Sequence, residues 1–170
     1  MAAFREDDIA YPRMVELAAC LCTELTASGL PDVCFCGVLP GAMVALDTCG
    51  GCGATGKCGQ AWVRLVSVFP SNNFPNPDSA PTCASLLAFE LEIGVMRCAP
   101  AMDSRGNPPT VAQQLDAVRL QTADMLAMRR AVACCMGGTD NAYFLGTYSP
   151  YGPQGGCVGG SWTVVVGQEF

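Results

Sequence analysis

Apolar side chains recur at helical spacing near the start of the chain. They are Met14, Leu17, Leu21 and Leu25, separated by three or four residues. Asp7 and Asp8 precede this stripe and are suited to accept hydrogen bonds from the free backbone N–H groups of a first turn. Gly29 and Pro31 follow it, as a left-handed cap and a residue that cannot continue a helix. The pattern therefore predicts a helix that begins near Asp7 and Asp8 and ends at Gly29.

A second, longer helix is predicted from residue 110 to about residue 136. Thr110 and Gln113 have the spacing of a capping box, in which each residue satisfies a terminal backbone donor of the other. Gly137 and Gly138 end the segment. Its apolar residues form two displaced stripes, the first holding Val111, Leu115, Val118, Met125 and Val132, and the second Leu120, Ala127, Met128 and Ala131. We expect one stripe to pack on a sheet and the other to contact another subunit.

Alternation with a period of two predicts strands. The clearest strand runs from Leu86 to Cys98, where Leu87, Phe89, Leu91, Ile93 and Val95 share the core face. Glu90 and Glu92 point to the opposite face. In the strand predicted at residues 61–69, Trp62, Arg64, Val66 and Val68 share one face and Val63, Leu65, Ser67 and Phe69 the other, and both faces are expected to be largely covered. Further strands are predicted at residues 33–39 and 42–47, about a turn at Pro40 and Gly41, and at residues 142–148 and 161–166.

Three segments rich in glycine, proline or asparagine are predicted to be extended loops, at residues 48–60, 70–84 and 149–160. The second is expected to be an arm or hairpin tip that reaches a neighbour. The order of elements is helix, four strands, helix, two strands. It indicates a single α+β domain over residues 1–170, in which one mixed or antiparallel sheet of about six strands is flanked by two helices.

The composition argues against an enzyme. Twelve cysteines and no histidine occur among the 170 residues. Without imidazole the chain has no Ser/His or Cys/His nucleophile pair and no mixed Cys/His zinc site. Only 14% of the residues are charged, against about 25% in typical soluble proteins, which indicates extensive subunit contacts. We therefore expect no catalytic site and no cofactor.

The charge and hydropathy patterns disfavour two classes of partner. The formal net charge is −6 and the basic residues are scattered, whereas affinity for nucleic acid comes largely from clustered cations. No apolar run has the length of a signal-peptide core or a membrane span. We expect synthesis in a cytosol, no membrane partner and no specific binding of DNA.

The cysteines are candidates for disulfides or for thiols packed as small hydrophobic groups. They are Cys20, Cys22, Cys34, Cys36, Cys49, Cys52, Cys58, Cys83, Cys98, Cys134, Cys135 and Cys157. The sharpest motif is Cys49-Gly-Gly-Cys52, followed by Cys58, but a zinc knuckle commonly needs two such turns. Structural disulfides are therefore favoured over packed thiols, and both over a zinc site. A bridge between the two helices is one possible pairing.

Two pairs of charged residues have candidate roles outside catalysis. Glu90 and Glu92 lie too close along one strand for paired acid/base work, and no second polar cluster accompanies them. We expect them to face solvent or the lumen of an assembly. Arg129 and Arg130 are candidates for intersubunit salt bridges or for solvating a helix end.

Several segments resemble a family of virion proteins from long-tailed actinobacterial phages, encoded among the head-to-tail genes. They are residues 10–19 (AYPRMVELAA), 62–68 (WVRLVSV) with Pro70-Ser and Phe74-Pro after them, 114–119 (QLDAVR) and 156–163 (GCVGGSWT). The order of helices and strands is similar to that of tail terminators. The resemblance covers nearly the whole chain and carries over a role but no site residues, and the cysteine content departs from better-known terminators.

The resemblance implies a tail-terminator-like, ring-forming virion protein, assembled after synthesis in the host cytoplasm. Its copies are expected to form a hexamer in the virion neck that caps the tail tube and joins it to the head completion (connector) proteins. The genome would pass through the lumen without specific binding. The alternatives are another neck protein, such as a head-to-tail stopper or adaptor, and a cysteine-rich zinc-binding or redox module.

Overall fold

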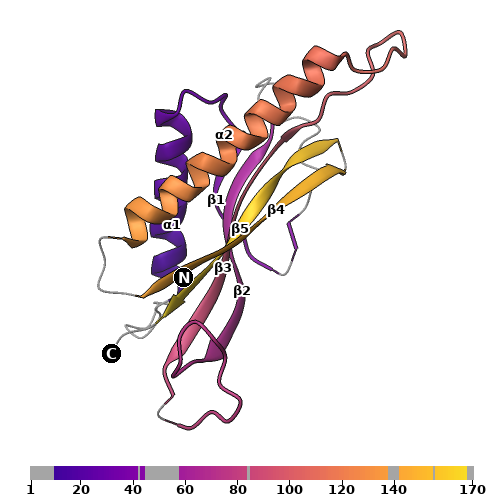
Figure 1. The fold of residues 1–170 in the computed structure, drawn as a ribbon. Helices are drawn as coiled ribbons and strands as arrows, with labels where there is room; N and C mark the ends of the chain where they lie inside the picture. Colours follow the sequence, from indigo (N-terminus) through magenta and orange to yellow (C-terminus); the bar gives the residue numbers. More distant parts are fainter. Residues whose placement is uncertain are drawn as a thin grey trace, which may run out of the picture.

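The computed structural model describes residues 10–41, 43–44, 58–83, 85–137, 142–154 and 156–167. They form two helices and five strands (Figure 1), in the order α1 (Ala10–Ala27), β1 (Phe35–Val38), β2 (Gln60–Pro70), β3 (Leu87–Cys98), α2 (Val111–Met136), β4 (Tyr143–Gln154) and β5 (Cys157–Gly167). The α+β class and both helices confirm the sequence prediction. The described residues hold five strands where about six were predicted.

The sheet is open and mixed. Its strand order is β1-β2-β3-β5-β4, with β1 parallel to β2 and every other neighbouring pair antiparallel. β1 pairs with β2 in parallel, and the strand predicted at residues 42–47, after the turn at Pro40 and Gly41, falls mostly outside the described residues. Met43 and Val44 belong to no strand, and residues 45–47 lie outside the described residues. A local turn signal does not exclude parallel pairing, which needs only a longer crossover between the two strands.

Both helices cover the same face of the sheet and enclose the main core. Buried residues of α1 (Leu17, Leu21, Leu25) and α2 (Ala127, Met128, Ala131, Val132) pack with Val63, Leu91, Ile93, Val95 and Val164 of the strands. The helix predicted at the start of the chain ends as expected, since Gly29 has a φ of +64°. Asp7 and Asp8 lie outside the described residues.

The capping box of α2 is present as predicted. The Thr110 side chain accepts a hydrogen bond from the backbone N–H of Gln113, whose own side chain accepts one from the backbone of Thr110. The second apolar stripe of α2 supplies most of its buried face, together with Val132 from the first stripe. The N-terminal part of the first stripe, from Val111 to Val118, stays exposed.

Two strand predictions need correction. Residues 149–160 are not an extended loop, because β4 continues to Gln154 and β5 begins at Cys157. Pro150 and Pro153 are tolerated because β4 is an edge strand, where a missing backbone N–H removes no necessary ladder bond. The expectation that both faces of β2 are largely covered is also wrong, because Val66 and Val68 are exposed.

The segment between β2 and β3 is a hairpin tip, one of the two predicted forms. Asn73 and Asn76 form an isolated antiparallel bridge within it. Asp78 accepts hydrogen bonds from the backbone N–H and the side-chain amide of Asn72. Figure 1 shows this hairpin extending past both helices at one end of the molecule. Its contact with a neighbouring molecule stays a prediction.

Candidate functional site

Disulfides join different elements of the fold. The three pairs with both partners described are Cys20–Cys135, Cys22–Cys36 and Cys58–Cys98, with Cα–Cα distances of 6.4, 5.9 and 5.8 Å. These distances lie within the roughly 4.4–6.8 Å that a disulfide spans. They tie α1 to α2, α1 to β1, and the residues just before β2 to the end of β3. Cys34 and Cys157 are also disulfide-bonded.

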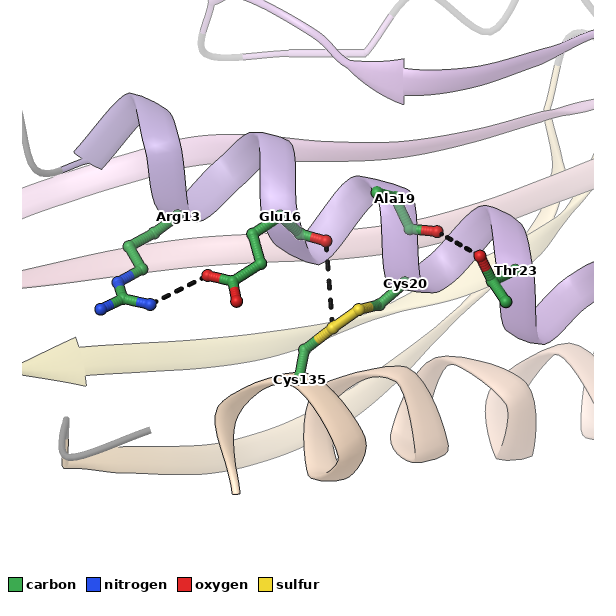
Figure 2. Close-up of a disulfide and its surroundings, with 6 residues drawn as sticks. All are labelled: Arg13, Glu16, Ala19, Cys20, Thr23 and Cys135. Atoms are coloured by element: carbon green, nitrogen blue, oxygen red, sulfur yellow. Dashed lines mark hydrogen bonds and ion pairs between the residues drawn. A yellow bond between two sulfur atoms is a disulfide. The ribbon is translucent and has the colours of Figure 1, made fainter. Parts of the chain in front are cut away.

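The bridge between the helices is the pairing that the sequence had left open. Figure 2 shows Cys20 of α1 bonded to Cys135 near the end of α2, with the Sγ of Cys135 lying 3.9 Å from the carbonyl oxygen of Glu16. Arg13 and Glu16 form an ion pair on the same stretch of α1, at 2.9 Å. The adjacent Cys134 is exposed and free, because neighbouring helical residues point about 100° apart.

The remaining cysteines have different surroundings. Cys83, in the hairpin tip, is exposed and free. Cys49 and Cys52, the proposed centre of the sharpest motif, lie outside the described residues. Within the described part of the chain, no group of three or more His, Cys, Asp or Glu side chains is arranged to hold a metal ion.

None of the helices described is long and apolar enough to cross a membrane.

The sheet face opposite the helices carries a polar network around Glu92. Arg64 donates two hydrogen bonds to this carboxylate, from Nε to Oε1 at 3.0 Å and from Nη2 to Oε2 at 2.9 Å. The indole N–H of Trp62 donates a third, to Oε1 at 2.9 Å. The side chains of Arg64 and Glu92 are largely buried. Glu92 therefore lies on the predicted face but is neutralised by Arg64 and shielded from solvent.

Glu90 lies on the same face and accepts a hydrogen bond from the hydroxyl of Ser67 at 2.7 Å. This contact corrects the predicted face of Ser67, which was placed opposite Arg64. A register shift between Leu65 and Ser67 lets the two strands pair Leu65 with Leu91 and Ser67 with Glu90. A bulge of this kind reverses the alternation beyond it. The sequence signal for two-residue periodicity does not reveal where such a bulge occurs.

A buried ion pair between β3 and α2 was missed by the sequence analysis. Arg97 donates from Nε and Nη2 to the two carboxylate oxygens of Asp124, at 2.6 and 2.7 Å, and from Nη1 to the carbonyl oxygen of Pro31 at 2.7 Å. Burial raises the pKa of the Asp124 carboxyl, and the hydrogen bond from Arg97 opposes this. One guanidinium thus fixes α2 to the sheet and to the connection after α1.

Two further hydrogen bonds attach the middle of α2 to β5. The side-chain amide of Gln121 donates to the carbonyl oxygen of Gly159, and the indole N–H of Trp162 donates to that of Met125 at 3.2 Å. Together with Asp124, these residues anchor α2 from residue 121 onward. Residues 111–120 lie before the first of these anchors.

Of the arginine pair, Arg130 has an ionic partner within the chain, and the predicted intersubunit salt bridges stay a prediction. Nε of Arg130 lies 3.0 Å from Oε2 of Glu24, and Arg130 also donates to the hydroxyl of Ser28. Within the chain its ionic partner is supplied by α1, because the antiparallel packing of α1 and α2 brings Glu24 within reach. Arg129, one residue earlier, is exposed.

The first ten residues of α2, which we call the projecting segment (residues 111–120), stand clear of the sheet. Val111, Leu115 and Val118 have 76%, 54% and 58% of their surface exposed. Figure 1 shows this end of α2 reaching beyond the strands, at the end of the molecule opposite the β2–β3 hairpin. The three side chains are spaced four and three residues apart, so they form one apolar stripe along the segment.

In the described residues, disulfides and buried ion pairs hold the helices and the sheet together, while the start of α2 exposes an apolar surface. The buried charged side chains are paired within the chain, as Arg64 is with Glu92 and Arg97 with Asp124, and the exposed surface includes the apolar stripe of the projecting segment. This arrangement suits binding by shape and buried area. No protein-family model matches the chain, and a comparison with curated proteins finds no match.

Proposed function

We propose that this chain is a structural virion protein of a long-tailed phage. In this proposal it is a tail terminator, whose copies form a ring that caps the tail tube and joins it to the head completion proteins around the DNA channel. The observation that carries the proposal is the projecting segment, where Val111, Leu115 and Val118 are exposed on a helix that has left its own sheet. Exposed apolar surface that serves no core is typical of a subunit contact.

The charge distribution supports a role beside DNA without binding to it. The chain carries a formal net charge of −6. Arg64 and Arg97 are each engaged by a carboxylate of the same chain, and so are Arg13, Arg119 and Arg130. Cations that are already neutralised contribute little to phosphate binding. A channel wall of this kind repels the duplex weakly and lets it slide.

The disulfide framework supports a particle that works outside the cell in which it is made. Eight described cysteines are disulfide-bonded. Disulfides form and persist mainly under oxidising conditions. A virion released by lysis meets those conditions after assembly, so oxidation would then stabilise subunits that are already in place.

The test is the location of the chain in purified virions of the phage that encodes it. Mass spectrometry of the particles should detect the chain, and cryo-electron microscopy should place a ring of it between the tail tube and the head. Density for the chain elsewhere in the neck would replace the terminator by a stopper or adaptor. Particles that lack the chain, or that hold it in the capsid shell or at the distal tip, would overturn the proposal.

A further inference from the structure

Strand β1 is attached to the molecule by a disulfide and by few other contacts. We infer that the bridge between Cys22 of α1 and Cys36 of β1 holds this strand on the sheet, so that reduction releases β1 while the other strands stay folded. The five-stranded sheet of the oxidised chain would then become a sheet of four strands, β2-β3-β5-β4. β1 would thus act as a redox-sensitive edge of the fold.

The non-covalent attachment of β1 is weak. The strand has four residues, lies at the edge of the sheet and pairs with β2 in parallel. Phe35 is 39% exposed, and the three residues after it are half-buried. Cys36 and Val38 supply its contacts with the main core. Parallel pairing is slightly less stable per residue than antiparallel pairing, and an element with few buried apolar contacts opens locally at low cost.

Packing between α1 and β1 is incomplete. A cavity of about 180 Å³ lies at the end of α1 and is lined by Cys22 and Leu25 of the helix, Leu30 of the connection and Cys36 of the strand. A cavity of this size admits water, so the side chains that line it gain little from facing one another. The disulfide crosses this poorly packed place. Much of the attachment of β1 to α1 therefore comes from the covalent bond.

The other two bridges with both partners described join parts that are already held together. Cys58–Cys98 lies beside the ladder of β2 and β3, in which Gln60 pairs with Met96. The bridge between the helices joins α1 and α2, whose buried faces pack in the main core. Loss of these bridges should lower the stability of the whole fold without releasing a single element.

A small dithiol can reach the bridge to β1, because Cys22 and Cys36 are half-buried and line the cavity. A thiolate of the reductant attacks one sulfur and displaces the other cysteine, which takes up a proton. The second thiol of the reductant then displaces the first cysteine, so the products are a cyclic disulfide and two cysteine thiols. Cys34, just before β1, is also disulfide-bonded, and the same reductant opens that bond.

Release of β1 would expose the edge of β2 from Gln60 to Val63, which β1 covers in the oxidised chain. An open strand edge is a template for pairing with another chain. A chain made in a reducing cytosol would carry this open edge, and an oxidising medium would close it. The two redox states would therefore differ at one defined edge of the sheet.

Amide hydrogen exchange measured by NMR tests the release. The β1 reporter is the backbone N–H of Leu39, directly after the strand, which donates to the carbonyl oxygen of Val63 at 3.0 Å. The β3 reporter is the backbone N–H of Leu91, in a strand paired on both sides. Both should be protected at least about a hundredfold in the oxidised chain. In dithiothreitol the β1 reporter should exchange within about tenfold of the rate of an unstructured peptide, while the β3 reporter stays protected at least about a hundredfold.

Two double variants, compared without reductant, assign the effect to one bridge. Cys22→Ala/Cys36→Ala should lower the protection of the β1 reporter at least about tenfold more than that of the β3 reporter. Cys20→Ala/Cys135→Ala is the matched control, because it removes a bridge that closes a longer loop. It should change the protection of the β1 reporter by less than about threefold, since local opening of β1 does not involve that bridge.

Other results would reject the release of β1. If both reporters lose protection in the same proportion on reduction, β1 opens only when the whole fold opens. If Cys22→Ala/Cys36→Ala protects the β1 reporter as well as the wild type does, other contacts hold the strand. An equal effect in the control variant would mean a general loss of stability. Absence of the chain from virions would reject the proposed function and leave the release of β1 standing, because exchange is measured on the isolated chain.

Discussion

Removal of the bridge between the helices is the perturbation with the most direct consequence for stability. The double variant Cys20→Ala/Cys135→Ala deletes the bond that ties α1 to the end of α2. It leaves the apolar contacts of both helices in place. The expected loss therefore comes chiefly from the unfolded chain, which gains conformational freedom when the cross-link is gone.

The magnitude follows from the length of the loop that the bridge closes. The two cysteines are 115 residues apart, and two other bridges inside this loop, spanning 14 and 40 residues, shorten it to roughly 60 residues. A loop of that length corresponds to about 4 kcal/mol of stabilisation in the chain-entropy relation. The same relation gives about 3 kcal/mol for the 14-residue bridge between Cys22 and Cys36. The bridge between the helices should therefore be the more stabilising of the two.

The assay is equilibrium unfolding in urea under non-reducing conditions, followed by circular dichroism. The double variant should unfold with a free energy about 4 kcal/mol lower than the wild type. Its dependence on urea concentration should also be steeper, because a less constrained unfolded chain exposes more surface. Cys134→Ala is the matched control, since it removes an exposed free thiol from the same helical turn and should change the free energy by less than about 0.5 kcal/mol.

A loss below about 1 kcal/mol would refute the reasoning, provided that mass spectrometry finds the bond in the wild type. It would mean that the unfolded chain is already held compact by other interactions. A loss as large in the Cys134→Ala control would place the effect in local packing at the end of α2. Equal losses for the bridges of 14 and 115 residues would reject the dependence on loop length.

Three other predictions test the interior and one loop. Asp124→Asn leaves Arg97 buried without its charge partner and should cost about 3–5 kcal/mol in urea unfolding, whereas Arg97→Met/Asp124→Leu should recover most of the loss. In Gly94→Ala the added Cβ would overlap ring atoms of the Trp62 indole. This variant should lose about 1–3 kcal/mol of stability, seen as a lower Tm. The pKa of the exposed Asp103 carboxyl is lowered by hydrogen bonds from Asn107. The largest contribution comes from the side-chain amide of Asn107 and the next from its backbone N–H. The stabilisation of that turn is therefore fully present above the unfolded pKa of about 3.9 and is lost as the pH falls through the lower folded pKa. An NMR titration of the carboxyl carbon checks this, and a pKa at or above the unfolded value contradicts it.

Local signals predicted both helices and β3 correctly. The capping box at Thr110 and the helix-ending glycine after α1 each depend only on residues a few positions apart in the chain. Such local features can be predicted directly from the sequence. β3 alternates clearly because one of its faces meets the core from Phe89 to Val95. By contrast, the parallel pairing of β1 with β2 and the length of β4 depend on which strand lies alongside, and local patterns do not carry that information.

The candidate site shows the same division. The cysteine count predicted disulfides, but the partners follow from helix packing and strand pairing. The face of Glu92 followed from alternation, while its pairing with Arg64 depends on strand register. One feature that was not predicted, the buried ion pair of Arg97 and Asp124, could have been inferred from the sequence. Arg97 occupies the core-facing position two residues after Val95, and a charge there demands a buried partner, which Asp124 supplies.

Stability and assembly should be separable, because different parts of α2 serve them. From residue 121 onward α2 is held by hydrogen bonds, an ion pair and a disulfide, whereas Leu115 is 54% exposed. A side chain already in contact with water contributes little to the fold, so Leu115→Asp should change the free energy of unfolding by about 0.5 kcal/mol or less. Urea unfolding at about 1 µM, where complexes with a Kd on the order of tens of micromolar or weaker are largely dissociated, measures this for the monomer. A loss above about 1 kcal/mol would mean that Leu115 packs within its own chain, and the projecting segment would then no longer count as a free surface.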